Sequence, residues 1–421
     1  MDKKRYIPVS GKVFDNHEIN NAIAAAKDGW WTEGRFAKEF ESRLRKFLPI
    51  DYVTLVNSGS SANLIAIAAL TSKVFGERRL QPGDEIIMTP LGFPTTVNPA
   101  ILYGLVPVFI DAEKNSLNMN AKLLEKAYSK KTKAIMVAHT LGKPFDLNSI
   151  IKFAQKHHLW VIEDCCDALG SKFEGQHVGT FGHIATFSFY PAHQITMGEG
   201  GAVVTKNPLI HRSLRQFRDW GRDCWCDTGK DNTCGRRFRW KLGQLPMGYD
   251  HKYIYSQIGF NLKLTDFQAA IGVAQMDKLP KFIEKRKRNH ALHVQFFKQY
   301  KKYFDIVEKS KNDDPCWFGF VLIVKKTAPF TRNELTEHLE AQGIGTRNIF
   351  SGNMLRHPAY EHIKCRKVGK FEVADFATYQ ACWIGVFPGI TIPEIRYIHQ
   401  VVRRFVQEKE MTHVENHDTK K

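Results

Sequence analysis

Short apolar runs alternate with helical patterns between residues 50 and 205, a rhythm typical of parallel strands joined by crossover helices. Helical spacing is clearest at Ser61 to Val74, Ala121 to Ser129 and Leu147 to His157. The seven expected strands are Tyr52 to Val56, Glu85 to Met88, Val106 to Ile110, Ala134 to Ala138, Trp160 to Ile162, Ile184 to Phe189 and Ala202 to Thr205. Ligands of such sheets bind beyond the carboxyl ends of the strands, so polar residues directly after these runs are the first place to look for chemistry.

The rhythm breaks between residues 211 and 260, where the segment Gly221 to Gly248 is polar, rich in glycine and without periodicity. A long irregular segment in a compact protein usually carries function. Beyond it the pattern predicts helices at Leu264 to Tyr303, Thr331 to Gln342 and Ile392 to Glu408, and a strand at Phe318 to Val324. We therefore expect a large domain, residues 1–280, that includes the insertion 211–260, and a smaller C-terminal α/β domain, residues 281–421.

The composition is that of an ordinary globular protein, with 43% hydrophobic and 25% charged residues among 421, which argues against extended disorder. There are 61 Lys and Arg against 43 Asp and Glu, a net charge of +18. Nucleic acid, an anionic small ligand and an acidic protein partner would each suit that charge. The first residues show no apolar core of signal-peptide length and no run is long enough for a bilayer, so we expect a soluble cytoplasmic protein without a membrane contact.

Polar residues follow two of the predicted strands in a way that suggests binding. Gly59 and Ser60 lie between a strand and a helix, where backbone N–H groups and the helix dipole favour an anion, although a simple helix cap has the same pattern. Glu163 and Asp164 end another strand. A carboxylate there can pair with the cationic ring nitrogen of a cofactor, and the alternative is a carboxylate that caps the next turn.

A third run connects these signals. The strand predicted at Ile184 to Phe189 ends in Ser188 and Phe189. Four residues, 190–193, and a turn, 194–197, follow it, and Gly198-Glu199-Gly200-Gly201 then leads into the next strand. This run resembles the pyridoxal-phosphate motif of the DegT/DnrJ/EryC1 sugar aminotransferases, and the chain follows that family from Ile7 to about Val406. The resemblance implies the aspartate-aminotransferase-like (type I PLP) fold, α/β, with a mostly parallel seven-stranded sheet in the large domain and a smaller C-terminal α/β domain.

The resemblance also implies the cofactor-binding residues. They are Gly59, Ser60, Phe93, Asp164, Ser188 and Asn261. By this analogy Phe93 stacks on the pyridine ring and Ser188 binds the phosphate. Asn261 reaches the phosphate of a neighbouring subunit, which implies a homodimer with shared active sites. Arg347 and Ser351 lie where relatives contact the sugar nucleotide, and Asp167 lies where many relatives carry Gln or His.

The chain departs from the aminotransferase pattern at His193, where those enzymes carry the lysine that forms a Schiff base with the cofactor. An imidazole cannot form that bond, so the cofactor would be held without a covalent link, as pyridoxamine phosphate (PMP). Histidine can still act as a base near neutral pH. The substitution resembles the 3-dehydratases of nucleotide-linked 4-keto-6-deoxy sugars, which remove the carbon 3 hydroxyl. A packed core histidine or a decayed site is the alternative interpretation.

Four cysteines suggest a further cofactor. Cys166 is followed after 57 residues by Cys224, then after one by Cys226 and after seven by Cys234. Four thiolates can hold an iron-sulfur cluster or zinc, although scattered buried thiols would give the same count and the paired Cys-x-x-Cys motifs common in zinc sites are absent. The spacing resembles the 2Fe-2S ligand set of one branch of the dehydratases. That resemblance implies CDP-4-keto-6-deoxy-D-glucose as the substrate and 3,6-dideoxy sugars of surface polysaccharide as the eventual products.

Such a reaction needs two electrons, and the resemblance implies that a separate NAD(P)H-dependent flavin or iron-sulfur reductase supplies them. Between Arg212 and Lys241 nine Lys or Arg stand against four Asp, so we expect the insertion to attract an acidic electron donor. One alternative is a cluster-free GDP-4-keto-6-deoxymannose type of 3-dehydratase that uses glutamate. Another is a zinc-stabilised basic protein that binds nucleic acid, but no known nucleic-acid-binding motif is present, so we expect no nucleic-acid partner.

Overall fold

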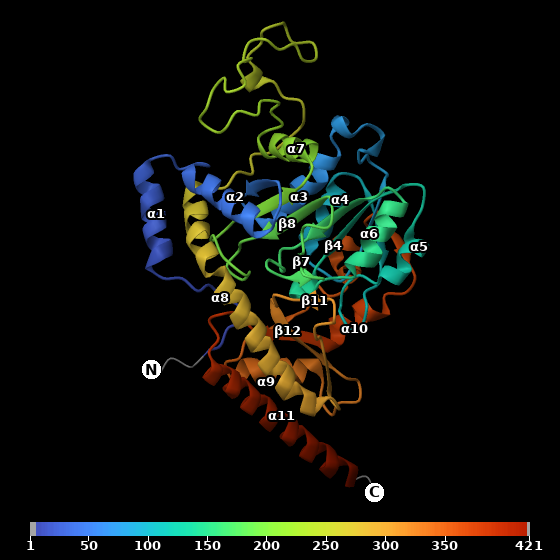
Figure 1. Ribbon diagram of the computed structural model, residues 1–421. Helices are drawn as coiled ribbons and strands as arrows, with labels where there is room; N and C mark the ends of the chain where they lie inside the picture. The colour runs from blue at the N-terminus through green and yellow to red at the C-terminus, as the bar shows by residue number, and fades with distance from the viewer. Residues whose placement is uncertain (1–5, 419–421) are drawn as a thin grey trace.

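The computed structural model describes residues 6–418, and its large sheet contains all seven predicted strands (Figure 1). They are β1 (Tyr52–Val56), β2 (Glu85–Met88), β3 (Val106–Ile110), β4 (Thr132–Ala138), β5 (Trp160–Asp164), β8 (Ile184–Ser188) and β9 (Gly201–Thr205). The strand order is β1-β9-β8-β5-β4-β2-β3-β14, and β9 alone runs against the other strands of this sheet. The carboxyl end of β5 therefore lies near the middle of the sheet.

The eighth strand of this sheet, β14 (Arg366–Val368), was not predicted and comes from the C-terminal part of the chain. It pairs in parallel with β3, and Arg366 donates to both carboxylate oxygens of Glu85, at 3.1 and 2.8 Å. The prediction of seven strands was one too few because this strand is short and none of its residues is buried. The division at residue 280 stays a prediction, since that position lies within one continuous helix, α8 (Asp266–Phe297).

Most of the predicted helices are present in the structure. The exception is the helix predicted from Ala121, where a 3-10 turn is followed by a single α-helical turn. The other helices are α1 (Asn16–Asp28), α2 (Arg35–Phe47), α3 (Gly59–Leu70), α4 (Pro94–Leu102), α5 (Leu124–Ala127), α6 (Leu147–Lys156), α7 (Pro208–Arg218), α9 (Arg332–Ala341), α10 (Glu372–Gln380) and α11 (Ile392–Asp418). Within residues 6–418 no helix is both long enough and apolar enough to cross a bilayer.

Two smaller sheets complete the fold. One is antiparallel, in the order β10-β12-β15-β13, and packs in the C-terminal core. Its strands are β10 (Phe304–Ile306), β12 (Gly319–Val324), β13 (Thr346–Asn348) and β15 (Ala381–Gly385). The other consists of two-residue strands: β6 (Lys172–Phe173), β7 (Gln176–His177) and β11 (Asp313–Asp314).

Helices cover both faces of the large sheet. Successive side chains of each strand point to opposite faces, so side chains on both faces are buried. Ile87 packs with residues of α2, α6 and α8 on one face, whereas Ile86 and Met88 pack with α3, α4 and α7 on the other. This arrangement explains why the strands are continuous apolar runs. It also leaves the ends of the strands as the places where polar groups can lie at the sheet.

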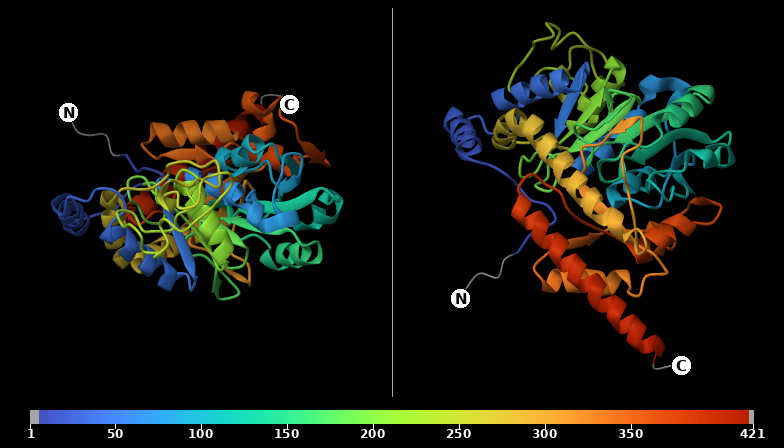
Figure 2. Two further views of the ribbon diagram at one scale, coloured as in Figure 1. Left: turned by 90° about the horizontal axis from the view of Figure 1, so that it is seen from above. Right: turned by 60° about the horizontal axis from the view of Figure 1, so that its bottom comes forward.

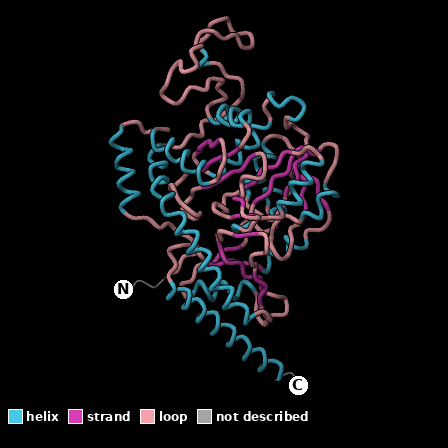
Figure 3. Tube along the Cα trace, in the orientation of Figure 1, coloured by secondary structure: helices cyan, strands magenta, loops and turns pink. Residues whose placement is uncertain are grey.

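The predicted irregular insertion is present but begins later than expected, because residues 208–218 form α7. Residues 221–258 contain one 3-10 turn, His251–Tyr253, and are otherwise loop (Figure 3). They project from the large sheet on the side away from α11 (Figures 1 and 2). The two ends of this segment meet, since the Ser256 N–H donates to the Gly221 carbonyl at 2.9 Å.

A carboxylate of α8 holds the start of α2. Asp266, 1% exposed, accepts the backbone N–H groups of Gly34, Phe36 and Ala37 at 2.9, 3.2 and 2.8 Å. A Cβ at Gly34 would lie 2.8 Å from Asp266 Oδ2, so this approach requires glycine. The contact supplies the hydrogen-bond acceptors that the first turn of a helix lacks.

We expect Asp266→Ala to lower the free energy of unfolding by about 2–4 kcal/mol, because it leaves three N–H groups without an acceptor. Denaturant unfolding monitored by circular dichroism would measure the loss. Glu361→Ala, which changes an exposed carboxylate, is the control and should remain within about 0.5 kcal/mol of wild type. A similar stability for both variants would contradict this role of Asp266.

Candidate functional site

Two neighbouring carboxylates end β5 and point to opposite faces of the sheet. Glu163 is fully buried, and its carboxylate accepts N–H groups from Gly179 at 2.8 Å, Phe181 at 2.9 Å and Gly182 at 2.6 Å. These bonds leave Glu163 no free face for a ligand. Its role is to hold the turn that precedes β8.

Asp164 is 5% exposed and is held mainly by side chains. Its Oδ2 accepts Asn63 Nδ2 at 2.9 Å and Thr96 Oγ1 at 2.7 Å, and its Oδ1 accepts the Cys166 N–H at 3.1 Å. All of these donors are neutral, so the negative charge of Asp164 has no cationic partner among them. A protonated ring nitrogen would supply that partner.

Asn63 and Thr96 were missed in the sequence. Each is a buried polar residue of an otherwise largely apolar helix, α3 or α4, and that contrast is the signal by which they could have been found. Asn63 Oδ1 also accepts Thr186 Oγ1 at 2.6 Å, which links α3 to β8. Two helices and two strands thus determine where the Asp164 carboxylate lies.

Gly59 and Ser188 meet beside this carboxylate. A Cβ at Gly59 would lie 2.5 Å from Ser188 Cβ and 3.0 Å from Cys166 Sγ, so only glycine permits this approach of α3 to the end of β8. Gly59 is the first residue of α3, and the Ser60 hydroxyl donates to Thr95 at 3.2 Å. Small residues at a helix N-terminus beside a buried carboxylate fit a cofactor that carries both a phosphate and a cationic ring.

Phe93 immediately precedes α4 and exposes 52% of its surface. Its ring is 6.2 Å from that of Phe350, and Ser351 Oγ donates to the carbonyl of Gly92 at 2.5 Å. The structure therefore brings Ser351 to the Phe93 loop. It does not show the same for Arg347, whose guanidinium donates to the carbonyl of its own neighbour, Thr346, at 2.7 Å.

Asn261 lies just after the insertion, and its side-chain oxygen accepts Lys263 Nζ at 2.6 Å. The carbonyl of Leu262 accepts the N–H of Asn57 at 2.9 Å, so this segment runs beside the loop that leads to Gly59. The side chain of Asn261 is exposed. Its reach to the phosphate of a second subunit stays a prediction.

His193 faces Asp167, a residue for which the sequence predicted no role. His193 Nδ1 lies 3.5 Å from Asp167 Oδ1, and both side chains are about 85% buried, being 14% and 15% exposed. Burial raises the pKa of Asp167, and the adjacent imidazole opposes that shift only in part. The Phe318 ring lies 5.2 Å from the imidazole, and Arg286 donates to the His193 carbonyl at 2.8 Å. This packing holds His193 in place, and its role as the base stays a prediction.

The structure brings three of the four predicted metal-binding cysteines together. Cys224, Cys226 and Cys234 line one small cavity in the insertion, together with His251. Cys166 is not among the residues that line this cavity, and its sulfur lies beside Gly59. That the four thiols hold one metal site stays a prediction.

The thiols of this cavity differ in acidity. Burial acts to raise the pKa of Cys226, but hydrogen bonds from Thr233, Cys224 and the Cys234 backbone outweigh it and lower that pKa. Burial raises the pKa of Cys224. A thiol that accepts several hydrogen bonds is prepared to act as a thiolate ligand.

A second group of side chains that could bind a metal lies in the protein core. Among residues 6–418, one set of three such donor atoms, from His139, Glu163 and Cys165, lies within 4.8 Å of one another. His139 Nε2 is 3.2 Å from Glu163, and its Nδ1 accepts the Phe145 N–H at 3.3 Å. This group is a satisfied hydrogen-bond network of the core.

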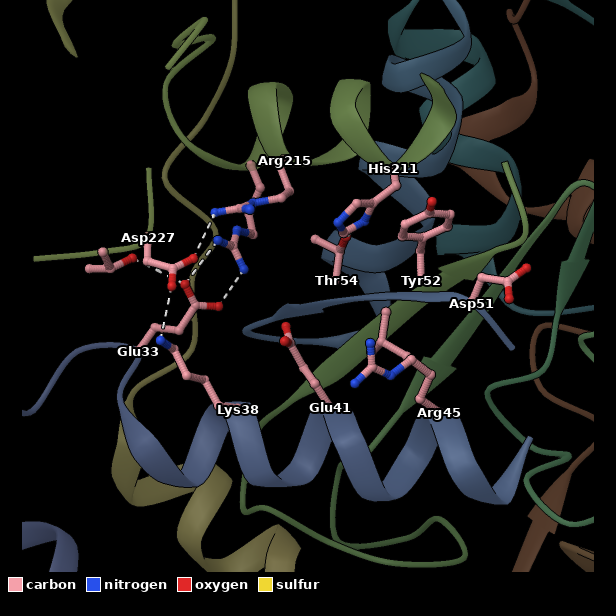
Figure 4. A pocket seen from close by; sticks show the side chains of 13 residues that line it. Glu33, Lys38, Glu41, Arg45, Asp51, Tyr52, Thr54, His211, Arg215 and Asp227 are labelled. Atoms are coloured by element: carbon pink, nitrogen blue, oxygen red, sulfur yellow. Dashed lines mark hydrogen bonds and ion pairs between the residues drawn. The ribbon is translucent and has the colours of Figure 1, made fainter. Parts of the chain in front are cut away.

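A polar cavity of about 140 Å³ lies between α2, β1 and α7, at the edge of the large sheet (Figure 4). Asp227 of the insertion closes one side of it, 2.9 Å from Lys38 and 3.9 Å from Arg215. Glu41 points into the cavity from α2. Burial and the nearby charge of Glu33 raise the pKa of Glu41 to about 7. None of the predicted cofactor or metal residues lines this cavity. Its ion pairs connect Asp227 of the insertion to α2 and α7.

Comparison with known proteins identifies relatives of the chain. The sequence profile of the DegT/DnrJ/EryC1/StrS aminotransferase family matches residues 13–403. The chain is 50% identical over 392 residues to the lipopolysaccharide biosynthesis protein RfbH of Salmonella typhimurium, covering 93% of this chain and 90% of that protein. It is 45% identical over 397 residues to the dTDP-4-dehydro-2,6-dideoxy-D-glucose 3-dehydratase of Saccharopolyspora spinosa, covering 94% and 86%.

Among solved structures, the chain resembles the GDP-4-keto-6-deoxy-D-mannose-3-dehydratase of E. coli with bound hydrated PLP. The TM-score is 0.84 at 29% identity, over 94% of this chain and 99% of that one. The predicted aspartate-aminotransferase-like fold is thereby confirmed.

The cavity of Figure 4 generates a pH-dependent prediction. Because the folded state raises the pKa of Glu41 from 4.5 to about 7, it binds a proton more tightly than the unfolded state between those pH values. Stability from this group is therefore present at low pH and is lost as the pH rises through about 7. We expect Glu41→Gln to gain about 2 kcal/mol relative to wild type between pH 5 and pH 8.

Thermal unfolding of both proteins across that pH range would measure the difference. Glu361→Gln, which alters an exposed carboxylate, should track wild type at every pH. A difference between Glu41→Gln and wild type that does not change with pH would contradict the assignment.

Proposed function

The chain belongs to the DegT/DnrJ/EryC1/StrS aminotransferase family, and we propose that it removes the carbon 3 hydroxyl of a nucleotide-linked 4-keto-6-deoxy sugar without transferring an amino group. The observation that carries this proposal is His193, which stands where aminotransferases of the family carry their lysine. The histidine is packed against Phe318 and faces Asp167, as a working base would be. Relatives named as 3-dehydratases support the same reaction class.

The proposed substrate is CDP-4-keto-6-deoxy-D-glucose, which makes the protein a CDP-4-keto-6-deoxy-D-glucose 3-dehydrase on the route to 3,6-dideoxy sugars of surface polysaccharide. The similarity to a lipopolysaccharide biosynthesis protein supports that route. The named dehydratases act on dTDP- and GDP-linked sugars, so the choice of CDP rests on the resemblance of the cysteine spacing. Turnover of CDP-, dTDP- and GDP-linked 4-keto-6-deoxy sugars, followed by mass spectrometry of the products, would rank the three.

Pyridoxamine phosphate, when bound, supplies an amine that condenses with the sugar ketone and a ring that accepts electrons. Gly59, Ser60 and Ser188 would hold its phosphate at the start of α3. Asp164 would keep the ring nitrogen protonated, since its carboxylate is buried and has only neutral donors.

His193 is the proposed base. With Nδ1 facing Asp167, its Nε2 is the atom that would accept a proton from the cofactor methylene carbon. The buried acid stabilises the imidazolium that results and fixes the ring orientation. Phe318 and Arg286 restrict the movement of His193, so its imidazole would stay within reach of the bound cofactor.

Completing the deoxygenation requires two electrons. The thiols of Cys166, Cys224, Cys226 and Cys234 are the proposed ligands of a 2Fe-2S cluster, which would supply one-electron chemistry when bound. The cavity that Cys224, Cys226 and Cys234 line and the hydrogen bonds to Cys226 support metal binding in the insertion. An NAD(P)H-dependent flavin or iron-sulfur reductase is the proposed donor, and the positive charge of the insertion suits an acidic partner. Asn261 is the residue through which a homodimer would share its active sites.

We expect purified protein reconstituted anaerobically with iron and sulfide to bind about two iron atoms per chain and to absorb in the visible range. One-electron reduction should give a paramagnetic signal. Cys226→Ser should lose most of the iron, whereas Cys365→Ser, a partly buried thiol outside the insertion, should keep it. Binding of zinc with no iron, or turnover that is stimulated by glutamate and needs no reductase, would contradict the cluster.

We expect His193→Asn to lower the rate of dehydration by a factor of about 10²–10⁴, because the variant lacks a group that can accept the proton. Binding of pyridoxamine phosphate, followed by its absorption, should persist because the phosphate and ring contacts are unchanged. His362→Asn, which alters a side chain that is 95% exposed, is the matched control. Near wild-type turnover of His193→Asn would show that another group is the base.

A further inference from the structure

We infer that Arg286 and Gln194 are positioning residues for the proposed reaction, because their side chains hold the backbone of both His193 and Asp167. Arg286 is fully buried and Gln194 is 2% exposed, so each acts through its neighbours and not by touching a sugar. The inference rests on the proposed function, since it names the side chains that place the proposed base and the acid that it faces.

Arg286 lies on α8 and is a buried charge whose acceptors are backbone carbonyls. Its Nη2 donates to the carbonyl of His193 at 2.8 Å, and its Nη1 donates to those of Trp317 at 3.1 Å and Phe318 at 3.4 Å. Burial lowers the pKa of Arg286 to about 10, so the guanidinium stays charged at neutral pH. Burying a charge that has no bonded carboxylate is costly, and packing alone does not account for that cost.

These carbonyls belong to two segments that lie on either side of the imidazole of His193. One is the loop that carries His193 itself. The other leads into β12 and carries Phe318, whose ring lies 5.2 Å from the imidazole at an interplanar angle of 44°. Arg286 therefore bonds both the backbone of the proposed base and the backbone of the ring that packs on it. A planar guanidinium suits this contact, because its N–H groups point in fixed directions.

Gln194 makes the corresponding contact on the side of the acid. Its Nε2 donates to the carbonyl of Asp167 and, at 3.2 Å, to the carbonyl of Cys316. The two side chains thus connect the backbone of Asp167 and His193 to the consecutive residues 316–318. Because His193 Nδ1 lies 3.5 Å from Asp167 Oδ1, a small shift of either backbone would change how the acid and the imidazole meet.

Arg286 also lies where α8 passes from one hydrophobic core to the other. Phe282, one turn earlier, packs in the core of the large sheet, whereas Phe296 and Phe297 pack in the C-terminal core. Figure 1 shows α8 running from the helices beside the large sheet to α9 and α11. The proposed base is therefore held by a side chain that both cores place.

The alternative is that Arg286 only stabilises the junction between the two cores. A purely structural role would lower the free energy of unfolding and leave the folded variant as active as wild type. A positioning role would slow the chemical step in protein that is fully folded and still binds its substrate. Denaturant unfolding of each variant, measured beside its kinetics, separates the two.

The kinetic test uses the holoenzyme and the nucleotide sugar that wild type turns over. We expect Arg286→Met to lower kcat by a factor of about 10–100 and to leave KM within about twofold, because a misplaced base slows chemistry without weakening substrate binding. Arg286→Lys keeps the charge but lacks the planar fork, so it should recover only part of the rate. Arg288→Met, which changes an exposed arginine on the same helix, is the matched control and should keep wild-type kinetics.

A second measurement does not depend on the reaction. In protein labelled with ¹⁵N in histidine, the ring signals of His193 are those that disappear in His193→Asn. We expect these signals to move or broaden in Arg286→Met and in Gln194→Met, and to coincide with those of wild type in Arg288→Met. If the signals change in this way but wild type dehydrates none of the sugars, the proposed function fails and the positioning role stands.

Wild-type kcat in folded Arg286→Met, or His193 signals that do not change, would overturn the inference. A rise in KM with kcat unchanged would do the same, because it would assign Arg286 to substrate binding. If Arg286→Met does not fold, Gln194→Met decides the question, since it removes the donor to the Asp167 carbonyl and leaves Arg286 in place. It should lower kcat at constant KM and alter the His193 signals, and wild-type behaviour in both would contradict the inference.

Discussion

Two adjacent carboxylates cannot both be buried at the end of a strand unless each has its own donors, and the site of this protein is built around that constraint. The pleat of β5 sends Glu163 and Asp164 to opposite faces, which separates their charges. Backbone N–H groups of one turn satisfy Glu163, and side chains of two helices satisfy Asp164. The first set positions the connection to β8, and the second positions α3 and α4. The candidate site therefore lies where the charge of this strand end has to be satisfied.

Buried strands were predictable because a strand covered on both faces is apolar throughout. Such a run can be recognised in the sequence without knowing which strand it pairs with. The strand β14 was not predictable, since it pairs with β3 and its Arg366 forms a partly buried ion pair with Glu85, which links residues far apart in the chain. The same limit applies to the site. Motif positions such as Gly59, Asp164 and Ser188 were predictable, and the structure brings them together.

Residues that act through a neighbour were beyond the reach of sequence patterns. Asn63 and Thr96 carry meaning only once α3 and α4 lie beside β5, and Asp167 gains a role only when the His193 loop folds against it. The cysteine spacing showed which thiols are available but could not show which of them meet. Spacing along a chain says nothing of whether residue 166 lies under the insertion or within the body.

The closure of the insertion has a consequence for how such a protein could arise and vary. The segment leaves and re-enters the body at one point, where Gly221 and Gln257 are joined by hydrogen bonding and a Cβ at Gly221 would overlap the Gln257 carbonyl, 1.9 Å away. The cost of a closed loop grows only slowly with its length, so the material between those ends can be lengthened, shortened or replaced while α7 and Asn261 keep their places. A metal centre held by such a loop, as proposed for this one, could be gained or lost in evolution while the rest of the fold stays the same. The closed ends at Gly221 and Gln257 would thus let the proposed electron transfer vary separately from the fold.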